Sequence, residues 1–431
     1  MKNKFSPVIL SVGLVVFGLL FVVASNSSLF RKSAATSSDG TVYQSLDASI
    51  TRDEAIVASS PTVTKPYIDL AALYLQKVRE TSDSSYYAKI DALMDSAAAI
   101  DPKNGDIPAI RASTAMGRHD FKAGNIFATQ AIALNPTRPA YFGLQGDAYI
   151  ELGRYADAVA AFQKMIDIRP DFNSWSRIAY IRELYGDIPA ARDALKQAIA
   201  SGSNYPENIA WAHVELGKLD LRTDPEVARK DFNDALGVLP TYTQAMEGLG
   251  KVEYAEGNSA QAEKQFISAY NGLALAQYAI DLGDLYDTQN NSTKASQYYA
   301  LAQNAFSTSI KAGVNTDLEE SLFLSDHRLD MENAIIMATR AYTDRPSIYG
   351  ADYLAWALYQ NSQPTQATSY TGEALRLGEN DPLIMFHQGM IALKNGDTVR
   401  AKAYLQKAYD LNPNFSIQYA KLLKTTLASL K

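Results

Sequence analysis

The chain of 431 residues contains no cysteine, and this absence excludes thiolate metal sites, cysteine nucleophiles and disulfides. Histidine is scarce as well. The four copies, His119, His213, His327 and His387, have no second histidine at the i+4 spacing of a helical metal pair, so we expect no metal and no cofactor. Lys and Arg number 40 against 47 Asp and Glu, and this net charge of −7 argues against nucleic acid as a partner.

Catalytic motifs are also missing. The sequence has no G-x-S-x-G nucleophile elbow and no G-x-G-x-x-G dinucleotide fingerprint. The stretch from Gly248 to Lys251 lacks the upstream glycine and the following Ser or Thr of a phosphate-binding loop. No segment is left over to form a catalytic domain, and we therefore predict that the chain is not an enzyme.

The N-terminus carries a membrane signal. Residues 5–30 are uncharged, and the apolar stretch from Pro7 to Ala24 would rise about 27 Å as a helix, close to the hydrocarbon thickness of a bilayer. We predict an uncleaved transmembrane anchor over residues 1–30. The alternative is a cleaved signal peptide, in which Val22 and Ala24 form the cleavage site. Lys2 and Lys4 place the N-terminus in the cytoplasm and the rest outside it, whereas cleavage would release a secreted or periplasmic protein.

The next segment changes composition abruptly. Ser and Thr make up 15 of the 41 residues from 25 to 65, and apolar residues show no sustained period. This composition is typical of a polar tether, so we predict a flexible linker over residues 31–65, in which a short helix near residues 53–58 is possible.

A unit of about 34 residues then repeats along the chain. Successive units begin 33 to 39 residues apart at Gly105, Pro139, Phe172, Ile209, Thr243, Ala276, Asn315, Ile348 and Pro382. The twentieth position is alanine in eight of the nine units, at Ala158, Ala191, Ala228, Ala262, Ala295, Ala334, Ala367 and Ala401. Small residues let two helices approach closely, bulky ones such as Phe162 fill the gaps, and a proline ends the second helix. Each unit is thus predicted to be a helix-turn-helix that needs its neighbours for stability.

These columns of small residues, Ala, Phe and Pro resemble the tetratricopeptide repeat family from about residue 105 to 413. The Trp often found at the fourth position appears only as Trp175. The resemblance implies an all-α fold, a right-handed α-solenoid superhelix of about ten repeats. Residues 66–102 look like a further, divergent pair, which gives a solenoid over residues 66–413. Residues 414–431 are expected to form a C-terminal capping helix.

In this family the first helix of each repeat lines the concave side, and its second, fifth, ninth and twelfth positions usually face the ligand. Carried over, the resemblance implies a partner-binding groove formed by Asp147, Tyr180, Glu183, His213, Asp220, Glu247, Lys251, Tyr254, Asp284, Asp287, Glu319, Asp326, Tyr349, Asp352, Trp356 and Tyr359. These residues are mainly carboxylates and aromatic residues with hydroxyl groups, and they include a single lysine. This composition predicts that the groove binds a basic or polar peptide. A merely solvated acidic face is the alternative. Near its C-terminal end the groove becomes apolar, and we expect the last helix to cover it.

Together these features predict a non-catalytic, membrane-tethered scaffold that binds peptide or protein partners in its concave groove. The alternative is an accessory or regulatory subunit that recruits an enzyme in envelope or polysaccharide assembly. The oligomeric state does not follow from the sequence.

Overall fold

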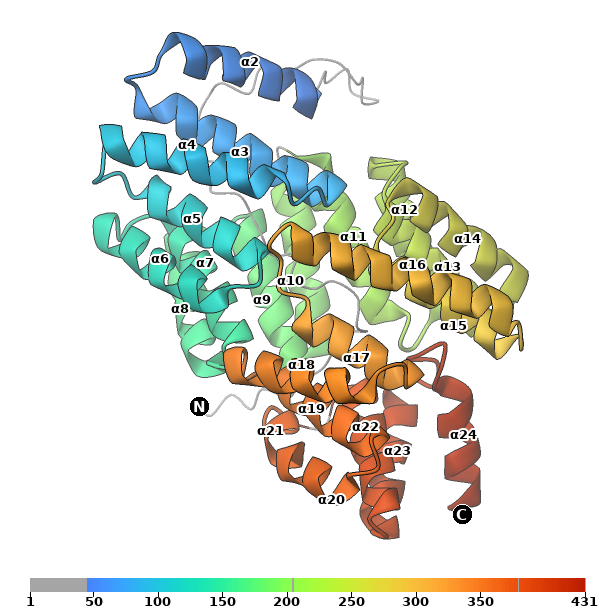
Figure 1. The fold of residues 1–431 in the computed structure, drawn as a ribbon. Helices are drawn as coiled ribbons and strands as arrows, with labels where there is room; N and C mark the ends of the chain where they lie inside the picture. Colours follow the sequence, from blue (N-terminus) through green and yellow to red (C-terminus); the bar gives the residue numbers. More distant parts are fainter. Residues whose placement is uncertain (1–44, 204, 379, 431) are drawn as a thin grey trace.

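The computed structural model describes residues 45–203, 205–378 and 380–430, and every regular element assigned in these ranges is a helix (Figure 1). The predicted anchor over residues 1–30 and the linker up to residue 44 lie outside the described residues. Within the described ranges, none of the helices combines the length and the apolar character needed to cross a bilayer.

Ten helical hairpins follow one another, each with a first helix A and a second helix B that pack against each other. Their helices are α3 (Thr64–Thr81) and α4 (Tyr86–Ile100), α5 (Asp106–Gly117) and α6 (Phe121–Leu134), α7 (Pro139–Glu151) and α8 (Tyr155–Ile168), α9 (Phe172–Leu184) and α10 (Ile188–Ser201), α11 (Pro206–Asp220) and α12 (Pro225–Val238), α13 (Thr243–Ala255) and α14 (Ser259–Gly272), α15 (Ala276–Thr288) and α16 (Ser292–Lys311), α17 (Asp317–His327) and α18 (Met331–Asp344), α19 (Ile348–Gln360) with the broken helix α20–η1–α21, and α22 (Pro382–Lys394) and α23 (Thr398–Leu411). The predicted α-solenoid of about ten repeats is confirmed.

Small residues mark the helix crossings, as the repeat pattern predicts. A Cβ added at Gly248 would lie 2.3 Å from the ring of Phe232, and one added at Gly217 would lie 2.7 Å from the same ring. Glycine therefore lets the A helices α11 and α13 approach the fully buried Phe232 of α12. The same arrangement brings Gly250 against Phe266 in the next repeat.

The structure differs from the predicted linker between residues 46 and 59. These residues form α2 (Leu46–Ser59), which packs on α3. Ser45 caps the helix by accepting a hydrogen bond from the Ala48 N–H at 3.2 Å, and the Tyr74 hydroxyl of α3 donates to Glu54 at 2.6 Å. The apolar pattern of α2 is weak because the helix buries only Ser49, Ile50 and Asp53, so the sequence shows little periodicity here.

The second helix of the ninth repeat is interrupted. It consists of α20 (Pro364–Ala367), the 3-10 turn η1 (Thr368–Tyr370) and α21 (Thr371–Ala374). The sequence TSYTG at this point combines β-branched residues with glycine, both of which are weak helix formers.

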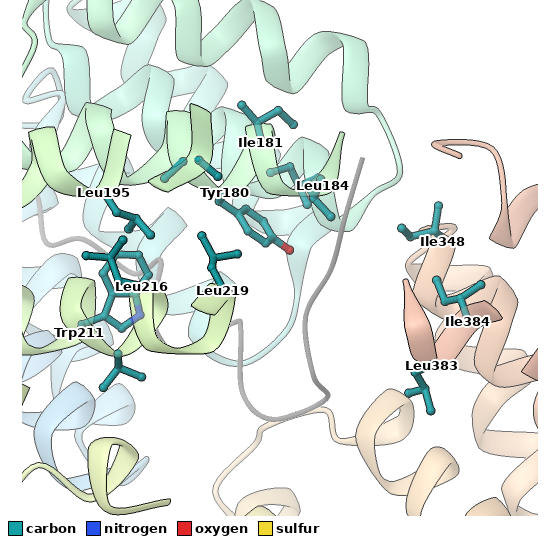
Figure 2. Packing of buried hydrophobic residues seen from close by; sticks show 14 of the residues in the cluster. Tyr180, Ile181, Leu184, Leu195, Trp211, Leu216, Leu219, Ile348, Leu383 and Ile384 are labelled. Atoms are coloured by element: carbon teal, nitrogen blue, oxygen red, sulfur yellow. The ribbon is translucent and has the colours of Figure 1, made fainter. Parts of the chain in front are cut away.

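The superhelix turns far enough for early and late repeats to touch (Figure 1). His119 Nδ1 lies 2.7 Å from the Asn315 carbonyl oxygen, and the Asn315 N–H donates to the Arg118 carbonyl at 3.0 Å. Farther along, the Ile348 N–H donates to the Tyr155 hydroxyl at 2.9 Å. One apolar cluster accordingly contains Tyr180 and Trp211 together with Ile348, Leu383 and Ile384, as Figure 2 shows. The array is closed on itself.

The chain ends in a segment that turns back along the repeats. Residues 412–419 run towards α15 and α17, and α24 (Ala420–Ser429) then packs on α23. The terminal helix is shorter than the predicted range 414–431, because an Asn412 side chain accepts a hydrogen bond from the Asn414 N–H and holds a turn there.

Candidate functional site, an acidic cavity inside the superhelix

A cavity of about 550 Å³ lies inside the closed superhelix. Its wall is formed mainly by α13, α15, α16 and α17, by the connection between α14 and α15, by the start of α22 and by residues 412–419. Among the described residues, seven carboxylates line it, against two lysines and one arginine, and the carboxylates are Glu183, Glu247, Asp281, Asp284, Glu319, Asp326 and Asp381. The interior of the array is therefore acidic.

The predicted groove residues divide into two sets. Seven line the cavity, namely Glu183, Glu247, Lys251, Tyr254, Asp284, Glu319 and Asp326. The other nine lie elsewhere, namely Asp147, Tyr180, His213, Asp220, Asp287, Tyr349, Asp352, Trp356 and Tyr359. Among all sixteen, only Asp287 is exposed to solvent, because the closed superhelix covers the concave side.

Glu183 of α9 occupies the part of the wall nearest the fourth repeat. Its carboxylate forms an ion pair with Arg222, which follows α11, and both side chains are at most a tenth exposed. Burial raises the pKa of Glu183 to about 8, although Arg222 opposes this shift.

A second group surrounds Lys251 of α13. Its ammonium group forms an ion pair with Glu247, one helical turn earlier, and lies 3.8 Å from Asp281 Oδ2 on α15. Burial opposes the charge of Lys251, but the carboxylates of Asp281 and Glu247 raise its pKa. The ammonium group of Lys251 thus pairs closely with the Glu247 carboxylate of the sixth repeat and lies near the Asp281 carboxylate of the seventh.

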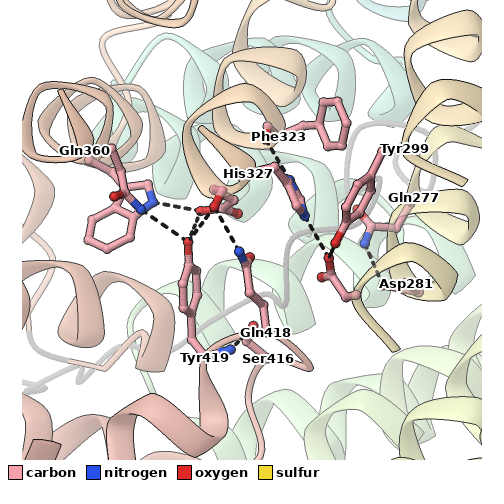
Figure 3. Close-up of polar contacts among 12 residues, drawn as sticks. Gln277, Asp281, Tyr299, Phe323, His327, Gln360, Ser416, Gln418 and Tyr419 are labelled. Atoms are coloured by element: carbon pink, nitrogen blue, oxygen red, sulfur yellow. Dashed lines mark hydrogen bonds and ion pairs between the residues drawn. The ribbon is translucent and has the colours of Figure 1, made fainter. Parts of the chain in front are cut away.

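A third group joins α15, α16 and α17, and Figure 3 shows it at close range. His327 Nε2 lies 2.8 Å from Asp284 Oδ1, and His327 Nδ1 lies 2.8 Å from the Phe323 carbonyl oxygen. The Tyr299 hydroxyl donates to the same Asp284 oxygen at 3.0 Å. Burial disfavours a charged imidazole here, but Asp284 and then Asp326 outweigh it and raise the pKa of His327 to about 9. The imidazolium can donate through both ring nitrogens.

We expect this ion pair to make stability depend on pH. Because the pKa of His327 rises from 6.5 to about 9 in the folded chain, its contribution is complete below pH 6.5 and is lost as the pH rises through 9. The loss should be about 3 kcal/mol, given that the side chain is 5% exposed. Urea unfolding of the wild type and of His327→Gln at pH 6 and pH 9.5 measures it. An equal pH dependence in both proteins would contradict the assignment.

Asp326 of α17 connects the cavity to the C-terminal segment. Its Oδ1 accepts hydrogen bonds from Trp356 Nε1 at 2.7 Å and from the Tyr419 hydroxyl at 2.9 Å. Gln418 Nε2 donates to the Asp326 carbonyl at 2.9 Å (Figure 3). The Tyr419 ring packs edge-on against Trp356 at 5.7 Å. The last helix was expected to cover the apolar end of the groove, but in the structure Gln418 and Tyr419, which precede α24, make these contacts.

Buried ion pairs also hold predicted groove residues outside the cavity. Arg177 donates to Asp147 through Nε at 2.9 Å and through Nη2 at 2.6 Å, and Arg177 is 1% exposed. In the last repeats, Asp352 lies 2.7 Å from His387 Nδ1 and accepts from Gln388 Nε2 at 2.9 Å. These carboxylates therefore join neighbouring A helices within the chain.

Sequence reasoning missed the cations that accompany this acidic interior. Arg177 and His327 fall outside the four ligand-facing positions of the repeat, and Arg222 lies in a turn. Asp381 was missed too, since it precedes its helix as the N-cap. A charged residue two positions before a small crossing residue, as Arg177 is before Ala179, was the available signal for an interior position.

One group of side chains has the residue types of a metal site. Ligand atoms of His213 on α11 and of Asp231 and Asp234 on α12 all lie within 4.8 Å of one another. Burial and hydrogen bonding to Asp220 raise the pKa of Asp231 to about 7. The sequence prediction of no metal considered histidine pairs within one helix, and this group forms only when α11 and α12 pack together.

Comparisons with known proteins agree with this fold. Residues 111–171 and 354–414 match the tetratricopeptide repeat family. Human tetratricopeptide repeat protein 7B is 30% identical over 127 residues, which are 28% of this chain and 14% of the human protein. The chain thus contains tetratricopeptide repeats within a helical repeat scaffold.

Several solved structures are similar at low identity. PilW, a type IV pilus biogenesis factor, is 16% identical with a TM-score of 0.40, covering 47% of this chain and 93% of PilW. A human IFIT1 dimer with m7Gppp-AAAA is 15% identical with a TM-score of 0.48, covering 77% of each chain. Yeast Tom70 is 14% identical with a TM-score of 0.36, covering 90% of this chain and 96% of Tom70.

Proposed function

We propose that the chain is a non-catalytic interaction scaffold that receives a basic peptide segment of a partner protein at its acidic interior. The observation that supports this most directly is the cavity wall, where seven carboxylates accompany three Lys and Arg side chains. Carboxylates bind lysine and arginine through charge-assisted hydrogen bonds, and an acidic surface accelerates the encounter with a basic partner.

The size of the cavity limits what it can receive. A volume of about 550 Å³ lies within the range of small-ligand pockets, so it can hold a short segment of chain but not a folded domain. Tyrosine side chains such as Tyr254 and Tyr270 on its wall would contact the stem of a bound lysine or arginine. We therefore propose that the partner contributes an extended basic segment.

We further propose that residues 1–30 hold the scaffold at a membrane, with the repeats outside the cytoplasm. The eighteen-residue apolar stretch and the flanking lysines of the sequence support this arrangement. If the segment is cleaved instead, the chain is secreted or periplasmic. Extraction of membranes with carbonate and with detergent separates the two cases, because an anchored chain stays in the membrane through carbonate treatment.

Asp287 allows the partner hypothesis to be tested without disturbing the core. It is exposed and lies one helical turn beyond Asp284 on α15. Because it adds negative charge beside the cavity, we expect Asp287→Lys to reduce partner crosslinking several-fold, measured by crosslinking of the full chain in cells and mass spectrometry. Asp193→Lys, exposed on α10, is the matched control. Equal crosslinking in both variants, or crosslinks confined to the outer B helices, would contradict the proposal.

A further inference from the structure

The group of His213, Asp231 and Asp234 draws its side chains from both helices of the fifth hairpin. His213 lies on α11, whereas Asp231 and Asp234 lie about one helical turn apart on α12. A ring nitrogen of His213 and one oxygen of each carboxylate all lie within 4.8 Å of one another. All three residues are partly exposed, and the Asp234 side chain is 39% exposed, so an ion can reach the group from solvent.

His213 differs from the other three histidines in its hydrogen bonding. Each of those places a ring nitrogen within 2.8 Å of an oxygen atom. The Nδ1 atom of His213 is buried and has no hydrogen-bond partner among the residues that the structure describes. Buried polar atoms in native proteins are usually satisfied, and imidazole is the commonest metal ligand among side chains. An unsatisfied imidazole beside two carboxylates therefore points to a bound ion.

Core packing holds the three side chains in register. Gly217 on α11 lets the ring of Phe232 on α12 approach, since an added Cβ would lie 2.7 Å from that ring. His213 lies one turn before Gly217 on α11. Asp231 and Asp234 lie on either side of Phe232, which is fully buried. Because core contacts fix the two helices, the ligand atoms are brought together before any ion binds.

The charges around the group favour an added cation. Asp231 is hydrogen-bonded to Asp220, and Asp220 forms an ion pair with Arg192 of the preceding hairpin. The Oδ2 atom of Asp234 lies 2.6 Å from the Lys230 ammonium group, and the lysine side chain is 73% exposed. Lys230 is thus free to turn into solvent when an ion binds. A divalent cation held among these carboxylates offsets their mutual repulsion better than one exposed ammonium group does.

We propose that His213, Asp231 and Asp234 bind one divalent transition-metal ion, which joins α11 to α12. One imidazole nitrogen and two carboxylate oxygens are donors that Zn²⁺ accepts, with a fourth position left for water. Mg²⁺ and Ca²⁺ prefer oxygen donors throughout, so the imidazole favours a transition metal. The three residues lie outside the lining of the acidic cavity, and the inference does not rest on the partner protein proposed above.

Calorimetric titration of the full chain, purified without a histidine tag, measures the binding of Zn²⁺. We expect one ion to bind per chain, with an affinity about tenfold or more lower in His213→Gln and in Asp234→Asn, because each variant removes a ligand. Mg²⁺ should not compete. Glu226→Gln is the matched control and should bind as the wild type does, since Glu226 is exposed on the same helix α12 and lies outside the group.

Lys230→Ala tests the site in the opposite direction. This variant keeps all three ligands and removes the cation that competes for Asp234, so we expect Zn²⁺ to bind several-fold more tightly. Thermal unfolding followed by circular dichroism is a second measurement. Zn²⁺ should raise the midpoint of the wild type and of Lys230→Ala and leave that of His213→Gln unchanged, because only a folded chain with the complete site binds the ion.

Several results would overturn the proposal. Absence of saturable Zn²⁺ binding to the wild type would do so, as would equal affinity in His213→Gln or equal binding of Mg²⁺, because the imidazole would then not be a ligand. Weak binding of several ions that no variant alters would be adventitious binding to an acidic surface. If His213→Gln does not fold, Lys230→Ala decides the outcome, since an unchanged affinity there would place the ion elsewhere.

Discussion

Replacing Arg345 by alanine should destabilise the chain by about 3 kcal/mol and open the superhelix, because it leaves the largely buried carboxylates of Glu151 and Glu319 without their cation. Arg345, in the connection after α18, is 5% exposed. It donates through Nε to Glu151 of α7 at 3.2 Å and through Nη1 to Glu319 of α17 at 3.3 Å, and its guanidinium lies 4.7 Å from the ring centre of Phe121. A single side chain therefore joins the second and third repeats to the eighth.

Urea unfolding and small-angle X-ray scattering measure the two effects, as a lower midpoint and a larger radius of gyration. Arg340→Ala is a matched control, because Arg340 lies nearby on α18 and pairs with Asp317 while remaining 56% exposed. An exposed pair of this kind contributes about 0.2–1 kcal/mol. If the two variants unfold at the same urea concentration, Arg345 does not hold the superhelix closed.

Replacing Phe232 by alanine should cost about 3–5 kcal/mol, since a fully buried aromatic ring would leave a cavity that glycine neighbours cannot fill. Phe232 is 0% exposed, and the backbones at Gly217 and Gly248 contact its ring directly. Denaturant unfolding followed by circular dichroism gives the loss of stability.

Two further variants make the packing argument specific. Val227→Ala changes a residue of the same helix α12 that is 43% exposed, and we expect a change within about 0.5 kcal/mol. Phe232→Leu keeps most of the apolar volume and should recover part of the stability lost in Phe232→Ala. A large loss of stability in Val227→Ala would show that the burial of a side chain does not set the cost of its truncation on this helix, because alanine is the better helix former.

The repeat fold was predictable because each crossing needs the same kind of residue. Ala228 and Ala235 are fully buried where α12 packs against its neighbours, and Phe232 lies between them. The spacing of these residues in the sequence therefore identifies the buried face of α12. The helix α2 was less predictable, since it buries few apolar residues. The spacing of small and bulky residues within a repeat predicts a helical hairpin, whereas an edge helix such as α2 buries too few apolar residues to give a clear pattern.

The site was predictable only in part. Position within the repeat identified seven cavity residues, because the A helices do line the interior. It could not show that Trp356 is 1% exposed or that Asp352 is fully buried, since both depend on contacts with α22 and with residues 415–419. Nor could it identify Asp381, whose place on the wall depends on how far the superhelix turns. The repeat pattern therefore does not predict which side chains become buried when the early and late repeats of the superhelix come into contact.

The contacts between early and late repeats also change how the chain can fold and unfold. In an open solenoid each repeat touches only its neighbours, so the ends can fray one repeat at a time. Here the hydrogen bonds of Asn315 with Arg118 and of Ile348 with Tyr155 join residues nearly 200 positions apart. Such long-range contacts raise the contact order and slow folding, and truncation of the late repeats would also release the early ones. Closure makes a modular array behave as one cooperative unit.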